Sequence, residues 1–143
     1  MTHRFISAFG IALGFLIVSA PLLAHHGNAE FNMAKTVTVK GTVTEWFWAN
    51  PHCFLKFDEK TESGDVRHWV VETSNPPDMV NLGWSRYSMK PGDAVTVTMH
   101  QVKDPNRPIG RLIRVVLPND KVLGTGAGDN AGSGAPKPEA YPK

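Results

Sequence analysis

The stretch Ser74–Gly83, which reads SNPPDMVNLG, decides the fold of this 143-residue chain. Proline is tolerated in the first turn of a helix, and glycine suits the position just past its end. Pro76, Pro77 and Gly83 therefore mark a short helix. The chain on both sides of this helix shows the period-two alternation of polar and β-branched residues that is typical of half-buried strands. The fold then depends on how many strands precede and follow the helix.

Three strands are expected before the helix. The first covers residues 36–44, where valines alternate with threonine and lysine. Gly41 interrupts this strand at an inward-facing position, where a glycine commonly marks a bulge or a tight bend. The second and third strands, His52–Asp58 and Val66–Thr73, are predicted to form a hairpin about the turn Glu62–Asp65.

Two further strands are expected after the helix, over Ala94–Val102 and Gly110–Leu117, and the turn Lys90–Asp93 leads into the first of them. Three strands, a helix and two strands, with a bend in the first strand, is the order of an oligonucleotide/oligosaccharide-binding (OB) barrel. The sequence thus predicts an all-β fold, a small five-stranded Greek-key barrel with a helix between the third and fourth strands. A short β-sandwich is the alternative.

Composition limits the classes of function. The chain holds 15 basic and 13 acidic residues, a net charge of +2, which is too small to indicate a nucleic-acid surface. Its single cysteine excludes an intramolecular disulfide framework and a zinc cluster built from cysteines. No GxSxG, HExxH, CxxC or P-loop motif is present. We therefore expect a protein that binds and does not catalyse.

Residues 1–24 have the layout of a secretory signal peptide, with Arg4, then an apolar run, then small residues ending at Ala24. Cleavage there gives a mature chain that starts at His25 and has no membrane span, located in the periplasm or secreted. An uncleaved anchor over residues 5–24 is the alternative.

A tail is expected at the other end of the chain. Residues 124–143 contain five glycines and three prolines, a composition that predicts disorder. The folded domain is accordingly predicted over residues 25–123.

Four motifs recur in order in a bacterial family: HHG at 25–27, VKGTVTEW at 39–46, WANPH at 48–52 and GWSRYSMKPGD at 83–93. On these residues the chain resembles domain-of-unknown-function family 6152, over roughly residues 25–120. The resemblance implies a short exported protein and no particular activity. Cys53 departs from the plain apolar residue expected after the NPH motif. The strand order also resembles the bacterial periplasmic OB-fold proteins of stress responses.

Histidines are the candidate metal ligands. A mature N-terminal His25 offers an α-amino group and an imidazole that together chelate Cu(II), and a cut one residue earlier makes His26 the third residue, another copper-chelating arrangement. His52, of the NPH motif, is the third candidate. Glu72 is expected opposite His52 or diagonal to it, where its carboxylate fixes the imidazole tautomer. Solvated terminal histidines and an inert His52 are the alternatives.

The other candidate ligands are expected to lie elsewhere. His68 is placed near residues 56–58, too far from His52 for a shared metal ion, and His100 is expected on the surface. Cys53 is expected in the core, on the face opposite His52. Met79 and Met99 are also assigned to the core.

Five residues form the largest aromatic group of the chain: Trp46, Trp48, Phe54, Trp69 and Trp84. Trp46 and Trp48 are predicted on the face of the first strand opposite its valines. Such aromatics belong to a core or an interface more often than to a sugar or base site. Two functions follow from the sequence: binding of copper or a similar divalent metal, or docking on another envelope protein through the aromatic face or a sheet edge.

Overall fold

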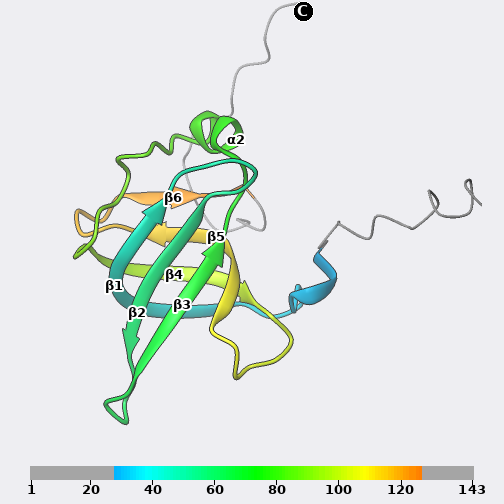
Figure 1. Ribbon diagram of the computed structural model, residues 1–143, viewed down its shortest axis with the longest axis vertical. Coiled ribbons are helices and arrows are strands. Elements are labelled where there is room, and N and C mark those ends of the chain that lie inside the picture. Colours follow the sequence, from blue (N-terminus) through cyan, green and yellow to red (C-terminus); the bar gives the residue numbers. More distant parts are fainter. Residues whose placement is uncertain (1–27, 127–143) are drawn as a thin grey trace, which may run out of the picture.

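The computed structural model describes residues 28–126. In this part of the chain, the helices and strands follow one another as shown in Figure 1: η1 (Asn28–Glu30), β1 (Val37–Phe47), β2 (Phe54–Lys60), β3 (Val66–Glu72), α2 (Pro76–Asn81), β4 (Ala94–Gln101), β5 (Ile109–Val116) and β6 (Val122–Gly124). None of the helices described is long and apolar enough to cross a membrane.

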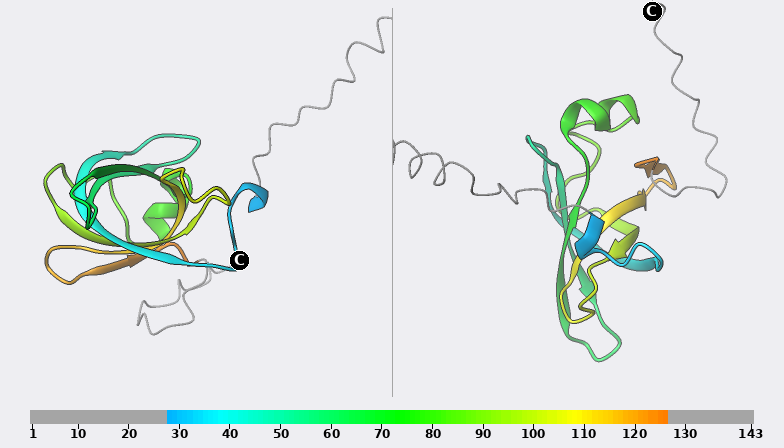
Figure 2. Two further views of the ribbon diagram at one scale, coloured as in Figure 1. Left: turned by 90° about the horizontal axis from the view of Figure 1, so that it is seen from below. Right: turned by 90° about the vertical axis from the view of Figure 1, so that its right-hand side faces the viewer.

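The strands close into a barrel. Their order in the sheet is β3-β2-β1-β4-β5-β6, and a parallel pairing of β3 with β5 joins the two sides. Seen along the barrel, the strands form a ring (Figure 2, left). This closure confirms the predicted small OB-like Greek-key barrel and excludes the β-sandwich. The short helix α2 lies between β3 and β4, as predicted, at one end of the barrel (Figure 1).

Strand β1 takes part in both halves of the barrel because it bends. It pairs with β4 over Val37–Thr42 and with β2 over Thr42–Phe47. A Cβ atom at Gly41 would collide with the backbone carbonyl of Asp58, so glycine permits the close approach of β1 to β2. Gly41 is thus required at an inward-facing position, as predicted, whereas the bulge of β1 lies further along, between Val43 and Glu45.

A bulge in β1 overturns the predicted position of Trp46. Val43 pairs with Phe57, but the register then shifts, and Trp46 pairs with Leu55. Leu55 and Phe57 are both fully buried, so the extra residue turns Trp46 onto the same face as Val43. The prediction that Trp46 and Trp48 lie on the face opposite the valines is wrong, because it assumed unbroken alternation. Both tryptophans pack against the core and are half-buried.

Strand β6 was not expected from the sequence. It adds three residues to the edge of β5, and its last residue, Gly124, lies one position beyond the predicted domain boundary. The indole Nε1 of Trp84 donates a hydrogen bond of 2.8 Å to the Gly124 carbonyl, and the Thr125 amide donates one of 2.8 Å to Ile113. A glycine-rich stretch is thus held by partners distant in sequence.

The interior of the barrel is apolar and continuous. Inward-facing residues of the strands meet Met79 of α2, which is fully buried and covers one end. Asn75 caps this helix, since its side chain accepts a 3.0 Å hydrogen bond from the Asp78 amide. The fully buried side chains are Phe57, Leu55, Met79, Met99, Leu112, Val43, Val71, Val97, Val115 and Cys53.

Candidate functional site

His52 and Glu72 lie together at the end of the β2–β3 hairpin. Glu72 pairs with Phe54, and His52 precedes Phe54 by two residues, so the histidine and the carboxylate are diagonal neighbours on one face. Nδ1 of His52 is in contact with Oε1 of Glu72. The predicted juxtaposition is therefore present, and Nε2 of the imidazole is left for another ligand.

The backbone fixes this arrangement, because the β2–β3 pairing continues past the first residue of β2. The Cys53 amide donates to Ser74 at 2.9 Å, and the Thr73 amide donates to Cys53 at 2.9 Å. The Thr73 hydroxyl donates a further bond to the same Cys53 carbonyl at 3.0 Å. His52 is thus attached to a residue whose amide and carbonyl are both hydrogen-bonded to the segment that follows β3.

The other two predicted ligands, His25 and His26, lie outside the described residues. Within residues 28–126, no three side chains of histidine, cysteine, aspartate or glutamate lie close enough to hold a metal ion. The described barrel accordingly offers one imidazole and its supporting carboxylate, and any further ligand has to come from elsewhere.

His68 occupies the other end of the same hairpin. It pairs with Asp58, and its Nδ1 lies 2.7 Å from Asp58 Oδ1. Four residues of strand separate this pair from the Phe54–Glu72 pair, about 13 Å at the usual rise per residue. The prediction that His68 is too distant to share a metal ion with His52 is confirmed.

The prediction that His100 is a surface residue is wrong. The residue is 9% exposed, and its Nδ1 lies 3.1 Å from the Lys35 carbonyl. A bridge between Phe31 and Val102 holds the segment before β1 against the end of β4, and this segment covers the imidazole. Strand alternation alone places His100 outside the barrel but does not show that a distant segment covers it.

Cys53 faces the core, as predicted, and burial raises the pKa of its thiol. The thiol is therefore kept protonated on the face opposite His52. Met79 and Met99 are also fully buried, which confirms their assignment to the core. Of the methionines that the sequence did not place, Met89 is buried and Met33 is exposed.

The tryptophans divide between the core and its rim. Trp69 and Trp84 are buried, as an assignment to the core predicts. The Trp46 ring lies 5.5 Å from Trp84 and 5.6 Å from Trp48, measured between centroids, and its Nε1 donates a 2.9 Å hydrogen bond to the Ser85 carbonyl. Trp46 thus connects the end of β1 to the segment after α2.

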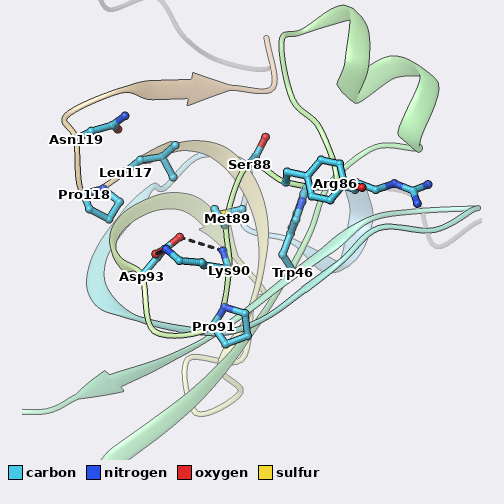
Figure 3. Close-up of a pocket in the computed structure, with 11 residues that line it drawn as sticks. Trp46, Arg86, Ser88, Met89, Lys90, Pro91, Asp93, Leu117, Pro118 and Asn119 are labelled. Atoms are coloured by element: carbon cyan, nitrogen blue, oxygen red, sulfur yellow. Dashed lines mark hydrogen bonds and ion pairs between the residues drawn. The ribbon is translucent and has the colours of Figure 1, made fainter.

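That segment, residues 83–93, forms one wall of an open pocket of about 680 Å³. The turn between β5 and β6 forms the opposite wall, with Leu117, Pro118 and Asn119 (Figure 3). The lining also contains Trp46, Arg86, Tyr87, Ser88, Met89, Lys90, Pro91 and Asp93. The GWSRYSMKPGD motif did not predict this pocket, although an aromatic residue and a cation, Tyr87 and Arg86, stand side by side in it.

An ion pair is part of the lining of this pocket. Lys90 Nζ lies 2.6 Å from Asp93 Oδ1, and the Lys90 amide donates to Asp93 Oδ2 at 3.0 Å (Figure 3). The hydrogen bonds from Lys90 lower the pKa of the Asp93 carboxyl. The turn that leads into β4 is therefore held by its own side chains, while Tyr87 projects into solvent with 86% of its surface exposed.

Comparison with known proteins identifies a family but no activity. No curated protein matches the chain. Among solved structures, the chain is similar to the mitochondrial single-stranded DNA binding protein Rim1 from S. cerevisiae, with 12% identity and a TM-score of 0.46, over 59% of this chain and 92% of that one. A model of a family of unknown function, DUF6152, matches residues 14–110. The resemblance carried by the HHG, NPH and GWSRYSMKPGD motifs is thereby confirmed: the chain belongs to DUF6152.

Proposed function

We propose that this protein is an exported, non-catalytic binding protein that takes up Cu(II) or a similar divalent metal through His25, His26 and His52. The observation that carries the proposal is the contact of His52 Nδ1 with Glu72. Metal-bound histidines usually pair their second ring nitrogen with a carboxylate, which fixes the tautomer and makes the ligating nitrogen more basic. His52 has this support and a half-exposed ring.

The remaining ligands come from the N-terminal segment of the mature chain. Cleavage after Ala24 leaves His25 with a free α-amino group beside its imidazole, and His26 adds a second ring. Nitrogen ligands of this kind suit Cu(II) above the other divalent metals of the first row. One imidazole from the barrel and a chelating terminus together supply three or four nitrogens.

The proposal requires the terminus to extend from Phe31 to His52. Phe31 is bridged to Val102, Val102 bonds to Ile109, and Ile109 pairs with Val70, two residues before Glu72. These three strand spacings amount to about 14 Å and lead to β3, and His52 lies one spacing further, on the segment that begins β2. His25 precedes Phe31 by six positions, which can span at most about 20 Å when extended and about 16 Å with the 3-10 turn at residues 28–30, so the proposal needs the terminus to run back over the barrel toward His52.

Native mass spectrometry of the protein recovered from the periplasm, before any chelator treatment, tests the proposal. We expect a mass that begins at His25 and includes one copper ion, with the ion lost on addition of a chelator. A chain that begins at His25 and stays metal-free after stoichiometric Cu(II) is added would overturn it. So would a chain that retains residues 1–24, because the terminal amine would then be absent.

A second candidate function is docking on another envelope protein, and one observation favours it. Phe47 is 45% exposed, and its ring lies 6.5 Å from that of Phe54 on the neighbouring strand. An exposed aromatic pair at the end of a hairpin is suited to an interface. In-cell cross-linking followed by purification should recover one partner that Phe47→Ser loses and Val122→Ser, at the far edge of the sheet, retains. If neither the unchanged protein nor the Val122→Ser variant recovers a partner, this function is wrong.

A further inference from the structure

The pocket between residues 83–93 and the β5–β6 turn is not used by the proposed metal site, and it lies beside the point where the chain leaves the barrel. We propose that this pocket binds the chain's own C-terminal segment, Ala135–Lys143 (APKPEAYPK), as an intramolecular peptide ligand. The proposal is independent of metal binding.

The end of β6 is connected to the pocket through two tryptophans. Trp84 Nε1 donates its hydrogen bond to Gly124, the last residue of β6, and the Trp84 ring lies 5.5 Å from Trp46, which lines the pocket. The opposite wall is the turn that connects β5 to β6. The segment that follows Gly126 therefore starts from the same hairpin that forms one side of the pocket.

The chemistry of the segment matches the lining. Proline-rich peptides bind grooves lined by aromatic residues, because their extended helix is already formed and loses little entropy. The segment holds three prolines and Tyr141 within nine residues. The pocket presents Trp46, the highly exposed Tyr87 and Pro91.

The pocket and the segment also carry opposite charges that can pair. Arg86 is a lining residue whose side chain extends outward at the edge of the pocket (Figure 3), and no carboxylate within residues 28–126 forms an ion pair with it. Glu139 lies at the centre of the APKPEAYPK segment, flanked by Lys137 and Lys143. Because Lys90 is already engaged with Asp93, Arg86 is the cation left for Glu139.

The linker is long enough for the segment to fold back. Residues 127–134 lie between the described chain and the segment, and eight extended residues span about 27 Å. Attachment through so few residues produces an effective concentration on the order of a millimolar. A peptide with millimolar affinity would therefore occupy the pocket about half of the time when it is attached to the chain.

Indole ¹⁵N–¹H spectra of the full-length protein, in metal-free buffer, test this proposal, with the four tryptophan signals assigned by single Trp→Phe variants. Replacing Pro136, Pro138 and Tyr141 together by serine should move the Trp46 signal. The Trp69 signal should stay in place, because that ring contacts Phe57 and Arg67 and lies outside the pocket lining. A matched linker variant, Asn130→Ala with Ser133→Ala, should move neither signal.

The peptide added separately completes the test. A synthetic peptide of residues 133–143, titrated into the triple-serine variant, should return the Trp46 signal toward its original position with a Kd on the order of a millimolar. Arg86→Ala combined with Tyr87→Ala should weaken this effect at least about tenfold. An unmoved Trp46 signal in the triple-serine variant overturns the proposal. A shift that depends on protein concentration also overturns it, since the occupant would then be a second copy.

Discussion

Two histidine–carboxylate pairs on the same hairpin have different surroundings. His52 and Glu72 are 45% and 20% exposed, whereas His68 and Asp58 are 77% and 36% exposed. The first pair lies at the end of the barrel, where Glu72 also pairs in register with Arg111 of β5. The second pair lies toward the hairpin turn, where β3 has no pairing with β5.

The difference shows why one pair is a candidate site and the other is not. A carboxylate shielded from water interacts more strongly with its partner, because the effective dielectric constant around it is lower. Glu72 is therefore the better support for a ligating imidazole. His68 has the same chemistry, but its partner is better solvated; within residues 28–126 neither pair has a third histidine, cysteine, aspartate or glutamate close enough to complete a metal site. Variants of the His68–Asp58 pair are therefore matched controls for variants of the His52–Glu72 pair.

The largest effect is expected from the histidines themselves. His52→Ala should lower Cu(II) affinity by about 100-fold or more, because it removes the barrel's own ligand, and His68→Ala should change it less than about threefold. Competition titration with a chromogenic copper chelator measures both affinities. Equal losses from the two variants would mean that copper binds histidines non-selectively, and the proposed site would be wrong.

The carboxylates come next. Glu72→Gln keeps the size of the side chain but weakens its hold on the His52 ring, so Cu(II) affinity should fall about tenfold. Asp58→Asn is the matched change at the other pair and should have no measurable effect. If Asp58→Asn lowered affinity as much as Glu72→Gln, net charge would explain both results, and the carboxylate–imidazole contact would lose its significance.

Cys53 provides a stricter control because it is the immediate neighbour of His52. Its thiol is buried, and burial raises its pKa, so Cys53→Ala should change Cu(II) affinity less than about twofold. The copper complex should also lack the intense visible charge-transfer band of a copper–thiolate bond. A loss of affinity comparable to that of His52→Ala, together with such a band, would place the thiol in the site.

Much of the hairpin could be predicted from sequence. The alternation in residues 52–58 and 66–73 and the turn between them set the register, and the register brought Glu72 beside His52 and Asp58 beside His68. The position of the predicted helix, between the third and fourth strands, likewise favoured the barrel over the β-sandwich. These features follow from local pattern because neighbouring strands in a hairpin are paired by a single turn.

The features that sequence missed depend on contacts between distant segments. The bulge after Val43 turns Trp46 inward, and no residue type between Val43 and Glu45 signals it. His100 is covered by Lys35, and Gly124 is held by Trp84, so neither could be placed from its own neighbours. The pocket has the same origin, since its walls come from three separate parts of the chain.

The smallest expected effect is on stability, and it tests whether the exposed Asp58–His68 pair contributes to folding. Ion pairs between solvated side chains contribute little, so a double-mutant cycle of Asp58→Asn and His68→Ala should give a coupling free energy of less than about 0.5 kcal/mol. For a domain of this size, a coupling free energy of about 0.5 kcal/mol corresponds to a change in Tm of at most about 2–4 °C. Thermal unfolding followed by circular dichroism at pH 6 measures it, and added salt should reduce what coupling there is. A coupling above about 1.5 kcal/mol would show that the Asp58–His68 pair is more shielded than its exposure indicates, and it would then no longer be a suitable control for the Glu72–His52 pair.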